Sequence, residues 1–391
     1  MRNEIQHSIK FSILITAGLT IILLFFNRSQ ITSIDFLISL PFFFLAYLSV
    51  FSIGKKNILV LFQDWIRKDR INVLFFPALL LIIFAIYQII NGHSLLKDNF
   101  PLVVYILFFP VIAFTIRNET SQKIGWFDFT VFVLTLLPTA FTEVKQQGEL
   151  PFKGQGFDSL FHIMTILTTV YAFGIVRGIK EVGFFPEWRW KSFITAILSW
   201  AAFYLLVLVV GFSVDFIRVV GYSEPFEILI RSIIFTLIGT FLHTALFEEL
   251  FFRGILQNML SKRIGQAKSW KIFWLVGFVI LFGCALLVGY TLEGQMKWFP
   301  ALVTVLLFAA AWLIEKSGKF EMGVYTSLAL TGVTFGLVHY HAKSIVYIGL
   351  ACVAGWAYGY TYIKTKNVFY SAIVHTLVNT SILIFGLKMM R

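Results

Sequence analysis

Apolar residues follow one another in long uninterrupted runs along this chain, without the spacing that marks one apolar face of a soluble helix. A membrane-spanning helix needs about 20 mostly apolar residues, and runs of that kind recur from Ile9 to the C-terminus. Because lipid offers the backbone no hydrogen-bond partner, such runs form helices or barrel strands. Barrel strands alternate in hydrophobicity over about ten residues, whereas these runs are continuous and longer. The pattern predicts an all-α, polytopic transmembrane helical bundle of about 12 to 14 spans.

The individual spans follow from the edges of the apolar runs. We predict them at 9–26, 35–53, 72–91, 100–116, 127–141, 158–176, 192–212, 226–259, 273–290, 299–315, 322–339, 344–363 and 367–387. The run that starts at Phe226 is too long for one simple crossing, so a tilt or a break near Gly239 is expected. Lys and Arg gather in alternate loops and the opposite loops hold mostly single basic residues, which predicts a cytoplasmic N-terminus.

The basic segment from Gln63 to Arg70 has an apolar start. It is compatible with a helix on the inner membrane surface and equally with a plain cytoplasmic loop.

Composition agrees with a membrane protein. Of the 391 residues, 58% are hydrophobic and 13% are charged, about half the charged fraction of a soluble domain. The net charge of +12 could indicate nucleic acid, but the basic residues lie in short loops between the runs, so membrane lipid is the expected partner and nucleic acid is not. Cys284 and Cys352 lie in apolar runs, which argues against a disulfide framework and against a Cys-rich metal site.

Two adjacent carboxylates and an arginine interrupt one of the apolar runs. They are Glu248, Glu249 and Arg253, and a charge at the bilayer centre costs at least about 2.5 kcal/mol. Glu249 and Arg253 are four residues apart on a helix and can pair, while Glu248 points about 100° away toward a cavity. Two carboxylates in unlike environments suit acid and base roles. The alternative interpretation is that these charged residues form a structural ion pair at a helix end and have no catalytic role.

Two further motifs lie in apolar runs. Phe335 and His339 share one helical face, as do His375 and Asn379 in a later run. At about 1.5 Å per residue, Glu249, His339 and His375 lie about 20, 25 and 14 Å from their cytoplasmic loops. All three depths fall inside a hydrocarbon core about 30 Å thick. These side chains are therefore expected to converge in one polar cavity.

The three motifs EExxxR, FxxxH and HxxxN, in this order, resemble the CPBP family of intramembrane peptidases, also called the Abi or CAAX-protease-like family. The resemblance covers about residues 226–391, so we expect a peptidase domain there and an N-terminal transmembrane region of unknown role at 1–225. About 80 residues, with two extra spans at 273–290 and 299–315, separate the first motif from the second, where family members have one loop.

The resemblance implies a role for each motif residue. Glu248 and His339 would position and activate a water, His375 and Asn379 would stabilise the oxyanion, and Glu249, Arg253 and Phe335 would support them. Amide hydrolysis needs such a base, such donors and a proton for the leaving amine. Zinc held by Glu248, His339 and His375 is the alternative, but the chain has no HExxH pair, so a reaction without a metal cofactor is favoured.

Three kinds of function fit these residues: an intramembrane endopeptidase acting on a membrane-associated peptide or protein, an inactive scaffold or immunity protein of the same fold, and a proton-coupled transporter. All motif positions are filled, which favours the enzyme, and the sequence lacks the internal repeat common in transporters. The composition, rich in Lys, Ile and Phe, suggests a bacterial protein of the cytoplasmic membrane. Oligomeric state and substrate are left open by the sequence.

Overall fold

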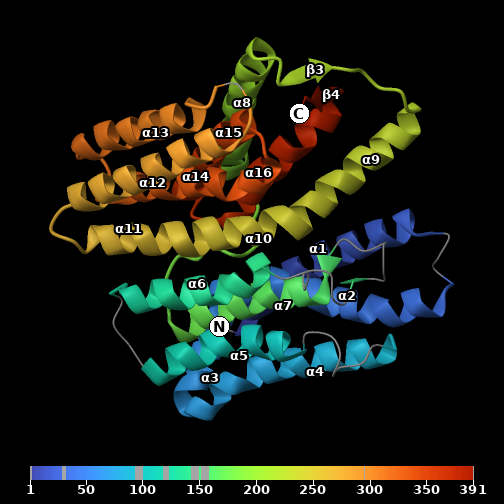
Figure 1. Cartoon of the computed structure of the whole chain (residues 1–391). Helices are drawn as coiled ribbons and strands as arrows, with labels where there is room; N and C mark the ends of the chain where they lie inside the picture. Colours follow the sequence, from blue (N-terminus) through green and yellow to red (C-terminus); the bar gives the residue numbers. More distant parts are fainter. Residues whose placement is uncertain are drawn as a thin grey trace. The chain divides into compact units, whose positions relative to one another are not determined.

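The computed structural model describes residues 2–28, 32–92, 100–117, 123–141, 149–150, 158–294 and 296–390. The chain forms two compact units, Met1–Pro186 and Glu187–Arg391, and both consist almost entirely of helices (Figure 1). Eight described helices are long and apolar enough to cross a membrane, and three shorter apolar helices accompany them. The chain is thus an integral membrane protein with a polytopic helical bundle, and each predicted span coincides with a helix or a continuous helical segment.

The N-terminal unit surrounds one buried helix. Its elements are α1 (Arg2–Phe26), α2 (Ile34–Ile53), α3 (Lys56–Lys68), the 3₁₀ turn η1 (Arg70–Leu74), α4 (Phe75–Ile90), α5 (Phe100–Arg117), α6 (Trp126–Phe141), the short paired strands β1 (Glu149–Leu150) and β2 (Asp158–Ser159), α7 (Leu160–Thr169) and the π-helical η3 (Val170–Val176). Every residue of α7 is buried, since α2, α4 and α5 pack around it. The sequence left open whether the segment from Gln63 to Arg70 is a surface helix or a loop. It falls mostly in α3, an amphipathic helix without buried residues.

A buried ion pair joins two elements of this unit. Arg177 donates from Nε to Asp128 Oδ1 at 2.5 Å and from Nη2 to the Lys123 carbonyl at 2.8 Å. Asp128 also accepts from the Gly125 backbone N–H at 2.8 Å. Because the carboxylate and the guanidinium are both bonded to several partners, the pair can be buried without leaving an isolated charge. It ties the start of α6 to the end of η3.

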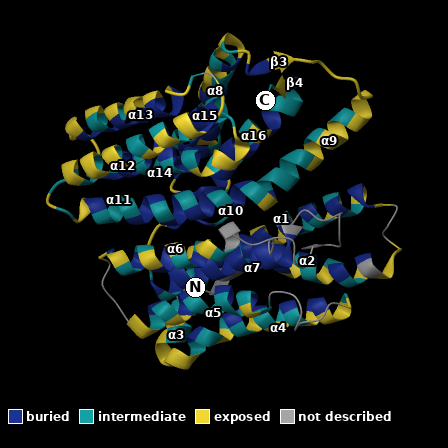
Figure 2. Ribbon diagram, viewed as in Figure 1, coloured by how far each residue is buried: buried dark blue, intermediate teal, exposed yellow. Residues whose placement is uncertain are grey.

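The C-terminal unit contains all of the sequence motifs. Its elements are α8 (Trp190–Ser213), β3 (Ile217–Val219), α9 (Phe226–Gly239), π-helical η4 (Thr240–Ala245), α10 (Leu246–Glu249), π-helical η5 (Leu250–Gln257), α11 (Asn258–Gly265), α12 (Lys271–Thr291), α13 (Phe299–Lys316), α14 (Val324–Val338), the 3₁₀ turn η6 (His339–Ala342), α15 (Ile345–Thr365), α16 (Val368–Ile384) and β4 (Leu387–Met389). β3 pairs antiparallel with β4, with Arg218 opposite Lys388. The core consists of α14, α15 and α16, while α8, α12 and α13 turn exposed faces outward (Figure 2).

This compact unit begins before the predicted boundary near residue 225, because α8 packs on α15 and α16. The division into a peptidase domain at 226–391 and an N-terminal region at 1–225 remains a prediction about function.

Glycines allow α14 and α15 to pack closely. A Cβ on Gly336 would lie 2.2 Å from Cys352 Sγ, and a Cβ on Gly355 would lie 2.7 Å from the Gly332 carbonyl oxygen. Small residues four apart on facing helices are the usual route to close packing in membranes, where burial of apolar surface gives little drive. The glycine pairs therefore fix α15 against α14, the helix that ends at His339.

The first motif lies on one continuous helix from Phe226 to Gly265. No break occurs at Gly239, which has ordinary helical dihedrals, φ −60° and ψ −48°. Instead, the π-helical stretches η4 and η5 flank the short α10 that carries both glutamates. Such wide turns are rare and are often found at functional sites.

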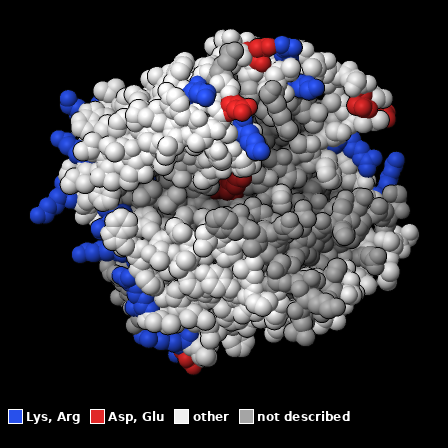
Figure 3. All heavy atoms as spheres, in the orientation of Figure 1, with Lys and Arg blue, Asp and Glu red and all other residues white. Residues whose placement is uncertain are grey.

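Figure 3 shows Lys and Arg along the edges of the drawn face, a further group of charged side chains in its upper part, and broad uncharged areas between them. Large apolar side chains are exposed on many of the helices, among them Leu198, Leu275 and Leu306. Exposed apolar bands on helices are what a lipid environment requires.

Candidate active site

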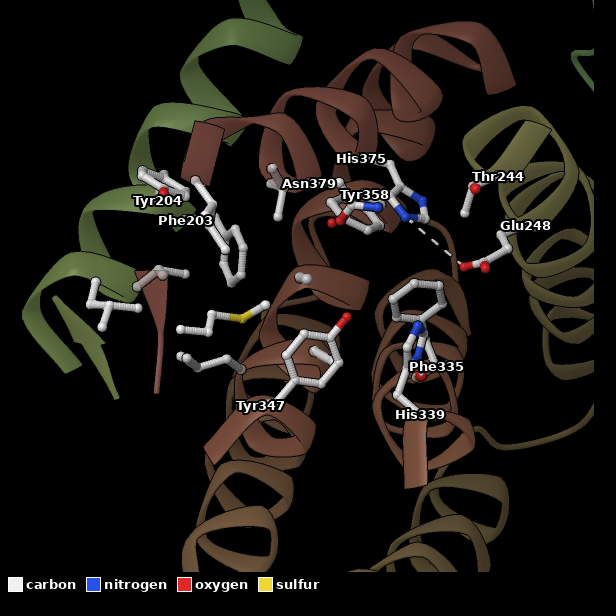
Figure 4. Close-up of a pocket in the computed structure, with 18 of the residues that line it drawn as sticks. Phe203, Tyr204, Thr244, Glu248, Phe335, His339, Tyr347, Tyr358, His375 and Asn379 are labelled. Atoms are coloured by element: carbon white, nitrogen blue, oxygen red, sulfur yellow. Dashed lines mark hydrogen bonds and ion pairs between the residues drawn. The ribbon is translucent and has the colours of Figure 1, made fainter. Parts of the chain in front are cut away.

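A cavity of about 380 Å³ lies inside the C-terminal unit. Its polar residues include Thr244, Glu248, His339, Tyr347, His375 and Asn379, and its apolar residues include Phe203, Val207, Ile217, Leu350, Ile382 and Met389. Glu248, His375 and His339 lie on one side of the cavity, and Phe203 and Tyr204 lie on the opposite side next to β3 and β4 (Figure 4). The cavity therefore combines a cluster of ionisable groups with an apolar region that can take uncharged parts of a ligand.

Arg253 is the cation behind this cavity. It is fully buried and donates from Nη1 to Glu249 Oε1 at 3.2 Å and from Nη2 to the Gly355 carbonyl at 2.9 Å. Its Nε lies 3.1 Å from Glu249 Oε2 without hydrogen-bond alignment, so charge attraction holds that contact. The guanidinium also lies over Phe335 and Tyr358, 4.6 and 5.2 Å from the ring centres. The ion pair expected from the i, i+4 spacing is thus present, and it is bonded across to α15.

Glu249 also holds the histidine of the third motif. Its Oε1 lies 2.9 Å from His375 Nδ1, a contact that joins helices 126 residues apart in the chain. Because Glu249 is paired with Arg253, it is the charged acceptor, and His375 Nδ1 carries the proton. The imidazole ring stacks on Tyr358 at 4.7 Å between ring centres and 13° between planes. These contacts fix the tautomer and the orientation of His375 and direct its Nε2 toward the cavity.

Glu248 lies in a different environment from its neighbour. Its side chain is 28% exposed, whereas that of Glu249 is fully buried. Glu248 Oε2 lies 4.0 Å from His375 Nε2 and has no hydrogen-bond partner among the described residues. The separation is too long for a direct hydrogen bond and suits one bridging water, which can donate to both acceptors. Glu248 is therefore the carboxylate with unused acceptor capacity facing the cavity.

His339 is held by its own helix. Its Nδ1 lies 2.7 Å from the Phe335 carbonyl oxygen, and since a carbonyl can only accept, Nδ1 is the donor. The Nε2 of the neutral ring then carries the lone pair. The Phe335 ring lies between the two histidines, 4.8 Å from His339 and 5.7 Å from His375. Phe335 thus sets the spacing of the imidazoles.

The four residues predicted as catalytic all line this cavity. Glu248 comes from α10, His339 from η6, and His375 and Asn379 from successive turns of α16. Glu249 and Arg253 lie behind them and support His375 instead of lining the cavity. The structure places these residues together; their chemical roles remain predictions.

Five further polar residues of the cavity were not predicted from the sequence: Tyr204, Thr244, His341, Tyr347 and Tyr358. Thr244 precedes Glu248 by one helical turn, so the i, i+4 rule applied backward from Glu248 could have found it. The three tyrosines have no such signal, because tyrosine is common in this chain and none of them lies within a recognised motif. His341 lies in the turn η6, next to the predicted His339.

Zinc is the metal that the alternative prediction would place here, on Glu248, His339 and His375. In the part of the chain that the structure describes, no group of three His, Cys, Asp or Glu side chains is arranged to hold a metal ion. Two tetrahedral zinc ligands with bonds of about 2.1 Å are about 3.4 Å apart, whereas Glu248 Oε2 and His375 Nε2 are 4.0 Å apart. As they are placed in this structure, these side chains do not fit zinc.

Fold and cavity together define a polytopic membrane protein with a shielded cluster of carboxylate, imidazole and amide groups, an arrangement suited to hydrolysis. Residues 230–326 and 319–381 match the family model of type II CAAX prenyl endopeptidases, Rce1-like. The match covers under half of the chain and includes all three motifs, so it confirms the resemblance to the CPBP family and supports a peptidase. Comparison with curated proteins and with solved structures finds no match.

Proposed function

We propose that the C-terminal unit is an intramembrane endopeptidase that hydrolyses a peptide bond of a membrane-associated protein or peptide with a water activated by Glu248 and His339. The observation that carries this proposal is Glu248 Oε2, an acceptor without a partner among the described residues, aimed at the His375 Nε2 across 4.0 Å. A water in this gap would be polarised by a carboxylate in a largely apolar cavity. Low polarity strengthens that interaction.

The steps follow from the positions of the groups. Glu248 accepts a proton from the water while the Nε2 of His339 orients it, and the water oxygen forms a bond to the scissile carbonyl carbon. The carbonyl oxygen becomes an oxyanion, which Asn379 stabilises by its amide and His375 by Nε2–H, since the ring takes up a proton from solvent before the attack and keeps it through the step. Glu249 stabilises the resulting imidazolium through Nδ1. The carbon–nitrogen bond then breaks, and the proton on Glu248 passes to the leaving amine.

The same geometry supports a reaction without a bound metal. Glu248, which has a carboxylate oxygen without a partner among the described residues, can generate the nucleophile unaided. The inactive scaffold and the transporter remain the competing functions. An apolar region beside the polar cluster suits a peptide substrate better than an ion path, which favours the enzyme. We place the protein in a bacterial cytoplasmic membrane with its N-terminus in the cytoplasm, and lipid and substrate are its expected partners.

The test is peptide cleavage by the purified protein in liposomes. The probe is a library of quenched fluorescent peptides rich in apolar residues, half of which carry an S-farnesyl cysteine near the C-terminus. Glu248→Gln keeps size and removes the base, so we expect a loss of about 10²- to 10⁴-fold in kcat without loss of folding. Activity should survive a strong chelator. Failure of every peptide to be cut, or full activity of Glu248→Gln, would contradict the proposal, and loss with chelator would restore the zinc alternative.

A further inference from the structure

The four predicted catalytic residues offer the cavity few hydrogen-bond donors in their resting state. His339 and His375 both commit Nδ1–H to protein acceptors, the Phe335 carbonyl and the Glu249 carboxylate. Each neutral ring therefore offers only the acceptor Nε2 to the cavity. Among the four predicted catalytic residues, the Asn379 amide is then the one permanent donor. An oxyanion is stabilised by donors that are in place before charge develops, so a second such donor is missing from the predicted set.

Tyr347 can fill this position. It lies in the first turn of α15, where its backbone N–H donates to Ser344 Oγ at 3.4 Å. Its ring centre is 5.9 Å from that of His339, and the residue lines the cavity together with Glu248, His375 and Asn379. The hydroxyl points into the space bounded by Phe335, Tyr358 and Asn379 (Figure 4). No hydrogen bond of this hydroxyl occurs within the described ranges of the chain, so it is available to a ligand.

The cavity has two other phenols: Tyr204 lies beside Phe203 on the side opposite Glu248 (Figure 4), and Tyr358 is also less suited to the role. It is 1% exposed, and its ring contacts His375 by stacking and the Arg253 guanidinium at 5.2 Å. Its packing fixes His375 from behind. Tyr347, by contrast, is half-buried and belongs to a different wall of the cavity.

We propose that Tyr347 is a further catalytic residue, whose hydroxyl donates a hydrogen bond to the carbonyl oxygen of the scissile peptide as that oxygen becomes an oxyanion. The phenol keeps its proton throughout, so the step adds no proton transfer to the reaction. Together with Asn379 it forms a pair of neutral donors on the side of the cavity away from Glu248. This inference rests on the proposed peptidase function, because it assigns a role within that reaction.

The test compares Tyr347→Phe with Tyr360→Phe in the liposome assay with the same peptide library. Both variants remove one hydroxyl from α15, but Tyr360 lies outside the cavity, against Lys364. For Tyr347→Phe we expect kcat to fall by about 10²- to 10³-fold, as for other single oxyanion donors. KM should stay within about threefold, since the interaction is made mainly in the transition state. Tyr360→Phe should match the parent protein.

The outcomes separate the two proposals. If the parent cuts peptides in a Glu248-dependent manner and Tyr347→Phe keeps kcat within about twofold, the role of Tyr347 is refuted and the peptidase function stands. If Tyr347→Phe raises KM or lowers the unfolding temperature while kcat is unchanged, Tyr347 has only a packing role, which also overturns the inference. If the parent cuts no peptide, or cuts without Glu248, both proposals fail.

Discussion

Removing Arg253 should destabilise the C-terminal unit far more than removing an exposed arginine. Arg253→Met leaves the fully buried Glu249 carboxylate without its cation and the Gly355 carbonyl without its donor. Breaking a buried ion pair on one side costs about 3 to 5 kcal/mol, because an uncompensated charge is left away from water. Glu249→Gln combined with Arg253→Met removes both charges and keeps an amide oxygen for His375 Nδ1–H. This double variant should lie within about 2 kcal/mol of the parent.

The chain offers its own probe for the measurement. Cys352 is fully buried on α15, and the only other cysteine, Cys284, is exposed. The protein carries Cys284→Ser and is held in detergent micelles to which dodecyl sulfate is added in increasing amounts. A thiol reagent then labels Cys352 only when the C-terminal unit unfolds, so the labelling rate reports unfolding. Arg218→Met is the matched control, since Arg218 pairs with Asp215 at the surface with both side chains more than half exposed.

Two results would refute this reasoning. If Arg253→Met is as stable as Arg218→Met, the buried pair contributes nothing that water cannot replace. Alternatively, the double variant could lose as much free energy of unfolding as the two single variants added together. The second result would mean that Arg253 acts through its packing on Phe335 and Tyr358 instead of through charge.

Two further predictions concern the frame of the site, and the same labelling assay checks both. Gly336→Ala places a Cβ 2.2 Å from Cys352 Sγ, so overpacking should lower the free energy of unfolding by about 1 to 3 kcal/mol. Peptidase activity should also fall, because His339 is three residues away. Gly283→Ala, whose Cβ meets no atom within 4 Å, is the control, and equal stability of the two variants would contradict the packing argument. Glu315→Ala should cost about 1.5 to 3 kcal/mol, because Glu315 accepts from three backbone N–H groups at the start of α14 at 2.9 to 3.1 Å. Glu315→Gln keeps one acceptor oxygen and should lose less; an equal loss would point to charge alone.

The helices, and the pairs of side chains within one helix, could be predicted from the sequence alone. Lipid offers the backbone no hydrogen-bond partner, so an unbroken apolar run must satisfy its hydrogen bonds within itself, as a helix does. This constraint acts within each segment and needs no knowledge of its neighbours. For the same reason the Glu249–Arg253 pair could be predicted, since four residues on one helix fix the separation. The order of the three motifs also indicated a peptidase, and the family match supports it.

Contacts between groups on different helices could not be predicted in this way. The sequence could not show that Glu249, and not Glu248, bonds His375, because that contact joins residues 126 positions apart. It gave no sign of Tyr347 at the cavity, nor of the close glycine contacts between α14 and α15 that place α15 beside His339. Helical periodicity describes the faces of one helix, whereas the rotation and depth of each helix depend on packing against its neighbours. The chemistry of this site lies in those contacts.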